Sequence, residues 1–252
     1  SSGWEKGIAE TRYKEAANLF RLMLQDLKKE YDVKIQFCLG NHDVTHISEF
    51  LNFANEFDTE LTKEKIEDGY FMEWDEIYYI FLNSCNGGQY EYGCLDYTKV
   101  ERILKGLPEN KSKILILHHT VMSMYEKDNS SIRNSAHLLE LIQKYNVIGV
   151  LHGHIHGREH FLIGQKRCRM IGTGALFSRN NPNVNSQFNI IEVESFIFRK
   201  ISTYIYMADD RISGHSWNKI SSEEDNNENY FRGDNFQDVY QSLISNLAYR
   251  PV

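Results

Sequence analysis

Apolar residues recur at two different spacings along the chain. Helical spacing of apolar residues predicts helices over residues 13–29 and 97–107, and the stripe of the first is suited to packing on a sheet. Further helices are expected at 46–54 and 135–144. Short apolar runs between them predict buried strands at 33–39, 77–82, 113–117 and 147–151. Strands that alternate with helices indicate a layered α/β domain.

The pattern changes in the second half of the chain. Residues 169–171, 188–193 and 197–206 alternate or run apolar without an intervening helix, which predicts strands of a second sheet. Residues 55–75 are acidic and mixed, and we expect them to form an exposed excursion. The polar, acidic stretch 208–234 is typical of a linker or a mobile arm.

Residues 236–247, near the end of the sequence, place apolar side chains on one helical face, and we expect an amphipathic helix there. So short a helix is marginal in water and needs a partner surface. That surface is either its own domain or a second subunit or downstream domain, so a homo-oligomer or a larger assembly is one expected outcome. The predicted organisation is a domain at 1–206, a linker at 207–234 and a terminal helix at 235–252.

Histidines follow three of the predicted strands directly. The first cluster is the Gly-Asn-His-Asp run at 40–43, the second is His118-His119, and the third contains His154 and His156. If residues 154–156 are extended, the side chains of His154 and His156 leave the backbone on the same side. Strand ends meet at one edge of such a sheet, so one shared site is expected, and imidazoles suit zinc, iron and related ions.

Composition narrows the classes of partner. The net charge is −7, which does not favour a nucleic-acid partner but is compatible with a phosphate substrate that bound cations neutralise. No apolar run reaches the ~20 residues of a membrane span. The four cysteines have no paired spacing, which favours free thiols and a cytoplasmic location.

The ordered set Gly-Asn-His-Asp, then His-His, then Gly-His-x-His resembles the calcineurin-like metallophosphoesterase superfamily. This resemblance covers residues 10–206. It implies an α/β fold with two facing mixed β-sheets flanked by helices, a four-layer sandwich. It also implies two divalent metal ions (manganese, iron or zinc) at the sheet ends and a phosphoester substrate.

The resemblance assigns a role to each matching residue. It places Asn41, His118 and His154 on one metal and His156 on the other. His119 stays an alternative to His118, since the two are adjacent.

The resemblance also implies that His42 is a general acid rather than a ligand, with Asp43 orienting it. Imidazole titrates near neutrality, and a carboxylate on its second nitrogen would fix the tautomer.

Two motifs of the superfamily are missing from the sequence. An Asp-x-His and a Gly-Asp that would precede the first helix should supply further metal ligands, yet no Asp-x-His occurs. The one Gly-Asp pair is Gly233-Asp234, in the wrong context. We expect that an N-terminal segment with its strands is missing from the chain; the alternative is a natively incomplete protein.

The sequence therefore predicts a metal-dependent phosphoester hydrolase. The first choice is a phosphodiesterase for nucleotides or cyclic nucleotides, in which a metal-activated hydroxide attacks phosphorus and His42 protonates the leaving oxygen. The alternatives are a nuclease of the same superfamily and a catalytically degenerate domain that serves as a scaffold or regulatory module.

Overall fold

The computed structural model describes residues 3–57, 59–88, 92–122, 130–155, 159–164, 167–176, 186–194, 197–209 and 214–224. Its helices are α1 (Gly3–Glu30), the short 3₁₀ helix η1 (Val44–His46), α2 (Ile47–Asn55), α3 (Lys63–Asp68), α4 (Tyr97–Gly106) and α5 (Ser135–Lys144). Its strands are β1 (Tyr70–Trp74), β2 (Ile77–Phe81), β3 (Lys113–Ile116), β4 (Val147–His152), β5 (Glu159–Ile163), β6 (Cys168–Gly172), β7 (Gln187–Glu194), β8 (Ile197–Asp209) and β9 (Gly214–Glu224).

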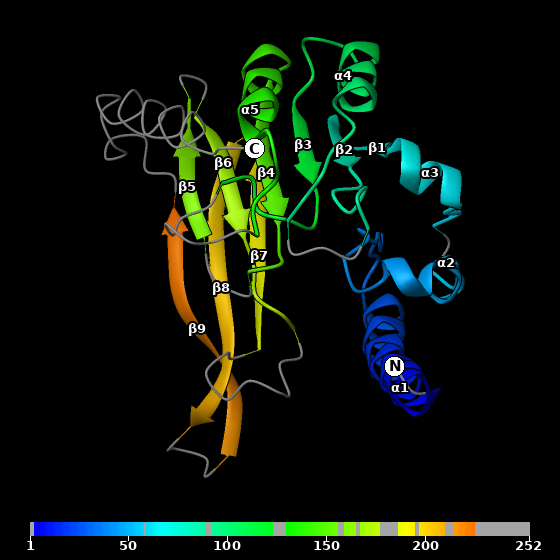
Figure 1. Ribbon diagram of the computed structural model, residues 1–252. Coiled ribbons are helices and arrows are strands. Elements are labelled where there is room, and N and C mark those ends of the chain that lie inside the picture. The colour runs from blue at the N-terminus through cyan, green and yellow to red at the C-terminus, as the bar shows by residue number, and fades with distance from the viewer. Residues whose placement is uncertain are drawn as a thin grey trace.

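The strands form two sheets (Figure 1). The larger has the order β1-β2-β3-β4-β6-β5 and is mixed, because β2, β3, β4 and β6 run parallel while β1 and β5 are antiparallel edge strands. The smaller has the order β7-β8-β9 and is antiparallel throughout, rather than mixed as expected. The α/β class with two sheets and flanking helices is confirmed.

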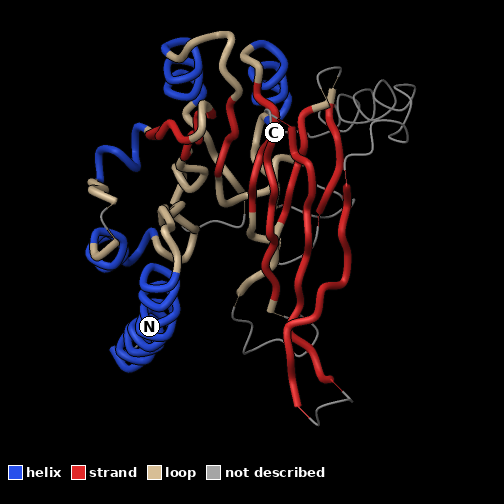
Figure 2. Tube along the Cα trace, turned by 180° about the vertical axis from the view of Figure 1, so that it is seen from behind, coloured by secondary structure: helices blue, strands red, loops and turns tan. Residues whose placement is uncertain are grey.

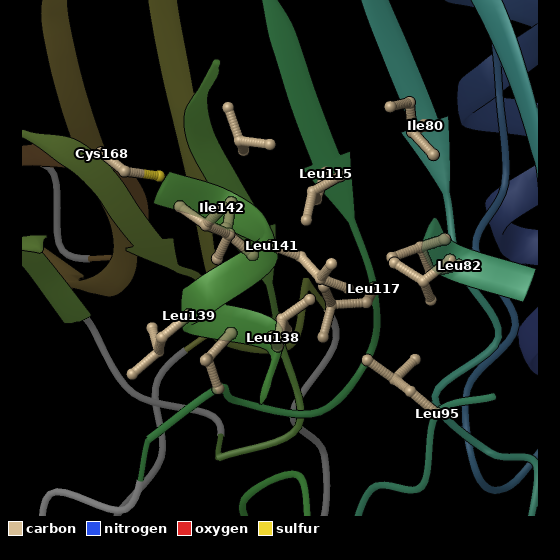
Figure 3. Close-up of a cluster of buried hydrophobic side chains, with 14 of the residues drawn as sticks. Ile80, Leu82, Leu95, Leu115, Leu117, Leu138, Leu139, Leu141, Ile142 and Cys168 are labelled. Atoms are coloured by element: carbon tan, nitrogen blue, oxygen red, sulfur yellow. The ribbon is translucent and has the colours of Figure 1, made fainter. Parts of the chain in front are cut away.

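Helices α4 and α5 cover one face of the large sheet. Buried side chains of both helices pack with side chains of the parallel strands in the largest apolar cluster, as the close-up of Leu138, Ile142, Leu115 and Ile80 shows (Figure 3). Each helix presents an apolar stripe at helical spacing, so burial of that stripe stabilises helix and sheet together.

The small sheet covers the opposite face. Phe198 and Ile201 of β8 pack with Ile77, Ile114 and Ile171 of the large sheet, so the two sheets face each other. Helices α1 and α2 lie beside the sheets (Figure 2), where Phe53 and Phe57 pack with Leu24 in a separate apolar cluster.

The structure corrects four expectations about elements. Among the described residues, 33–39 pair with neither sheet, although their apolar pattern predicts a strand. Phe37 instead packs against the rings of Phe50, Phe53 and Phe57, and its carbonyl accepts a hydrogen bond from the hydroxyl of Tyr70 at 2.8 Å. Side-chain packing rather than a neighbouring strand holds this segment.

The other corrections concern the segments expected to be irregular or differently paired. Residues 55–75, expected to form an exposed excursion, contain α3 and β1. Strand β1 adopts a regular structure because it pairs with β2. Strand β6 joins the large sheet, because it pairs in parallel with β4. The expected linker at 207–234 is wrong for 214–224, where β9 pairs along β8. The predicted terminal helix at 236–247 lies outside the described residues.

One glycine decides how closely the sheets approach. A Cβ added at Gly149 of β4 would overlap the Phe198 ring of β8. Because Phe198 is buried between the sheets, the ring has little freedom to move away.

We therefore expect Gly149→Ala to lower the free energy of unfolding by about 1–3 kcal/mol through overpacking. Adding Phe198→Leu should recover part of the loss. Gly106→Ala is the matched control, because a Cβ there meets nothing within 4 Å. Urea denaturation of the four proteins checks this, and an equal loss in Gly149→Ala and Gly106→Ala would contradict it.

Candidate metal centre at the strand ends

Parallel pairing brings several histidines to one edge of the large sheet. Phe81 of β2, Ile116 of β3 and Leu151 of β4 lie in register, so all three strands end at the same edge. His118 follows β3, and the backbone N–H of Gly153, after β4, donates to the His118 carbonyl at 3.0 Å. The ends of β3 and β4 are therefore joined where the predicted ligands lie.

Three of the predicted ligands converge. His118 Nε2 lies 3.0 Å from Asn41 Oδ1 and 3.0 Å from His154 Nδ1. Asn41 is buried, and the two histidines are half-buried. Residues 36 or more positions apart in the sequence thus bring a neutral amide oxygen and an imidazole nitrogen to the Nε2 atom of His118.

These spacings fit a shared cation. Two ligand atoms that lie about 2.1 Å from one ion, at a right angle to each other, are about 3.0 Å apart. A proton on His118 Nε2 could form a hydrogen bond with only one of the two neighbouring atoms. A cation, by contrast, is attracted to the lone pairs of all three atoms. The donor set therefore suits a divalent ion such as manganese, iron or zinc.

His154 occupies an unusual backbone conformation. Its φ is 71°, and the N–H of Ile155 donates to the carbonyl of Gly153 at 2.9 Å, which makes His154 the centre of a γ-turn. Turns of this hand are rare and strained for a residue with a Cβ. The argument that His154 and His156 leave an extended backbone on the same side does not hold at His154, because β4 ends at His152 and the φ of His154 is positive.

His156, the predicted ligand of the other metal, lies outside the described residues. Its assignment stays a prediction.

The Gly-Asn-His-Asp run does not follow a strand, yet it reaches the same site. The N–H of Gly40 donates to Asp43 Oδ2 at 3.0 Å, and the N–H of Asp43 donates to the Gly40 carbonyl at 3.0 Å. A Cβ on Gly40 would lie 3.3 Å from His118 ring atoms, so the absence of a side chain lets the run approach that ring. His42 is exposed between these contacts; its role as an acid and its orientation by Asp43 stay predictions.

His119 lies next to the converging atoms but is fully buried. His118, His119 and His154 each offer a ring nitrogen within 4.8 Å of the others, so they form a group that could hold a metal. His119 Nδ1, however, lies 2.9 Å from the hydroxyl of Ser84.

Ser84 is the part of the site that the sequence patterns did not indicate. It lies three residues after the end of β2, the strand beside β3, and Asn83 separates it from the apolar run that ends at Leu82. Its place among the polar residues that follow a buried strand, as the histidines follow theirs, is the signal that could have found it.

Burial changes the acid–base chemistry of the neighbouring side chains. Burial raises the pKa of the Cys85 thiol to about 12, and it raises that of the Cys38 thiol further. Burial also lowers the pKa of His152 to about 4. These thiols therefore stay protonated at neutral pH, and His152 stays neutral there.

A family model described as calcineurin-like phosphoesterase matches residues 8–158, more than half of the chain. The chain belongs to this family. Calcineurin-like phosphoesterases form a superfamily of metal-dependent hydrolases, in keeping with the histidine group at the strand ends. No curated protein sequence matches the chain.

Solved structures with a similar arrangement include two vacuolar protein sorting 29 proteins. The one from Cryptosporidium parvum is 10% identical with a TM-score of 0.31, covering 72% of this chain and 76% of its own. A single mutant from Entamoeba histolytica has the same identity of 10% and TM-score of 0.31, covering 69% of this chain and 75% of its own. A putative 5'-nucleotidase from Staphylococcus aureus is 12% identical with a TM-score of 0.35, covering 82% of this chain and 41% of its own. The assignment to the calcineurin-like phosphoesterase family rests on the sequence model.

The backbone at His154 generates a prediction about stability. Glycine adopts a φ of 71° without strain, whereas alanine does not. The His154→Gly protein should therefore be more stable than His154→Ala, by about 1 kcal/mol, measured by urea denaturation without added metal.

His137 in α5 provides the matched control. It lies in a regular helix, so His137→Gly should be less stable than His137→Ala by about 0.5–1 kcal/mol. The same order at both positions would show that the turn at His154 stores no strain.

Proposed function

We propose that this calcineurin-like phosphoesterase is an active, metal-dependent phosphodiesterase for nucleotides or cyclic nucleotides. The observation that carries the proposal is that Asn41 Oδ1 and His154 Nδ1 each lie 3.0 Å from His118 Nε2. A ligand set of this kind is consistent with hydrolysis, because divalent cations at such a site polarise a phosphoryl group and lower the pKa of water.

In this proposal Asn41, His118 and His154 hold one of two divalent ions, and His156 contributes to the other. Each of the three described ligands is neutral, so they add coordination without adding negative charge beside an anionic substrate. The choice among manganese, iron and zinc depends on availability as much as on these ligands.

His42 acts as the general acid in the proposed reaction. It directly follows Asn41 and is exposed, so a substrate at the metal site has access to its ring. The hydrogen bonds between Gly40 and Asp43 hold the backbone on both sides of His42 in a tight turn. An imidazole held in a fixed position is suited to protonating a leaving oxygen.

The location and extent of the domain belong to the same proposal. All four cysteines are free thiols, which favours a reducing compartment such as the cytoplasm. Among the described helices, none is both long and apolar enough to cross a membrane. We place the end of the phosphoesterase domain after β9 rather than at 206, because β9 completes the small sheet.

Metal binding gives the first test. His118→Ala should lower the tightly bound metal of the full chain, measured by elemental analysis after dialysis against Mn²⁺ or Zn²⁺, because it removes the nitrogen that faces both other ligands. His137→Ala, on the exposed side of α5, should leave metal content unchanged. Equal metal content in both variants would remove His118 from the site.

Turnover gives the second test. With metal added, the protein should hydrolyse a bis-(p-nitrophenyl) phosphate or a cyclic nucleotide, and His42→Ala should lower kcat about 10²–10⁴-fold without loss of metal. Substrates with good leaving groups need less protonation, so their loss should be smallest.

An equal loss across the leaving-group series would show that His42 is not the acid. No turnover by the unmodified chain with any metal would instead favour the scaffold or regulatory role, and preference for DNA or RNA would favour a nuclease.

A further inference from the structure

Ser84 connects the ends of two neighbouring strands. It follows β2, and its backbone carbonyl accepts a hydrogen bond from the N–H of Cys94 at 2.8 Å. Its side chain, fully buried, extends to the two histidines that follow β3. The residue therefore sits behind the proposed metal ligands rather than among them.

The hydroxyl of Ser84 makes three hydrogen bonds. It accepts from the backbone N–H of His118 at 3.2 Å and from the backbone N–H of His119 at 3.1 Å. It also lies 2.9 Å from Nδ1 of His119. A hydroxyl has two acceptor lone pairs and one proton. Both lone pairs are used by backbone N–H groups, so the hydroxyl donates its proton to His119 Nδ1.

A neutral imidazole that accepts at Nδ1 carries its proton on Nε2. The neighbouring thiol does not take the serine proton, because Cys85 Sγ donates to the Leu39 carbonyl at 3.6 Å, and burial raises its pKa to about 12. The His119 side chain is also confined, since a Cβ on Gly93 would lie 2.8 Å from His119 Cβ. His119 is thus held with an N–H donor at Nε2.

His118 needs the opposite tautomer. Its Nε2 faces Asn41 Oδ1 and His154 Nδ1, so a cation held by these atoms requires the lone pair at Nε2 and the proton at Nδ1.

We propose that Ser84 is a positioning residue that holds His119 with its ring proton on Nε2 and anchors the backbone of His118, so that His118 coordinates the cation and His119 is a hydrogen-bond donor. This inference rests on the proposed function for its metal. The proposal makes His118, rather than His119, the metal ligand, a choice that the sequence left open. Ser84 acts on the site through the backbone N–H groups of both histidines and through the ring of His119.

Long-range ¹H–¹⁵N NMR spectra of the full chain, labelled at histidine nitrogens, test the tautomers directly. Without metal, His119 should show a protonated Nε2 and an unprotonated Nδ1, and Ser84→Ala should reduce that population. Ser84→Thr keeps the hydroxyl and should restore it. A protonated Nδ1 on His119 in the unmodified protein would overturn the proposal.

Zinc titration of the same proteins gives a second, separate readout. His118→Gln should abolish tight zinc binding, His119→Gln should keep it, and Ser84→Ala should weaken it about tenfold, as residues that orient ligands do. Zinc binding lost equally in His118→Gln and His119→Gln would overturn the proposal. If the unmodified chain binds neither zinc nor Mn²⁺, the proposed function fails, whereas the His119 tautomer still decides the role of Ser84.

Discussion

The site depends on the parallel pairing of β2, β3 and β4. Their shared register places Ser84, His118 and His154, each from a different strand end, at one edge of the large sheet. Parallel strands need long crossovers, and α4 and α5 supply them while covering the face of the sheet. The packing that stabilises the fold and the geometry of the site therefore have the same origin.

The second constraint is the local backbone at each strand end. The γ-turn at His154 aims Nδ1 toward His118, and the glycine at position 40 lets the Asn41 loop approach the same ring. The unfavourable φ of His154 is a local cost that the rest of the fold must offset. A cation drawn to three lone pairs would add to that compensation, so metal binding and local structure are coupled.

Much of this architecture could be predicted from the sequence. The apolar runs that became β2, β3 and β4 are short, buried and followed by polar clusters, and the helical stripes of α4 and α5 are regular, so their periodicity was sufficient. The resemblance of the motifs predicted Asn41, His118 and His154 as metal ligands, and the structure brings these three side chains together.

Other features depend on contacts between distant segments. The run around Phe37 has the pattern of a strand, but its aromatic partners from α2 determine its conformation. Strand β9 is polar and acidic, so its own sequence does not indicate a strand. Its extended structure depends on pairing with β8. Ser84 belongs to no recognisable sequence motif. Its role arises from its contact with His119, which follows the neighbouring strand β3.

The central claim is that Asn41, His118 and His154 share one cation. The most direct measurement is an anomalous difference map from a crystal of the full chain grown with Mn²⁺. The account predicts a manganese peak about 2.0–2.3 Å from Asn41 Oδ1, His118 Nε2 and His154 Nδ1. A peak coordinated by His119 in place of His118, or Mn²⁺ bound elsewhere with these three atoms unligated, would contradict it.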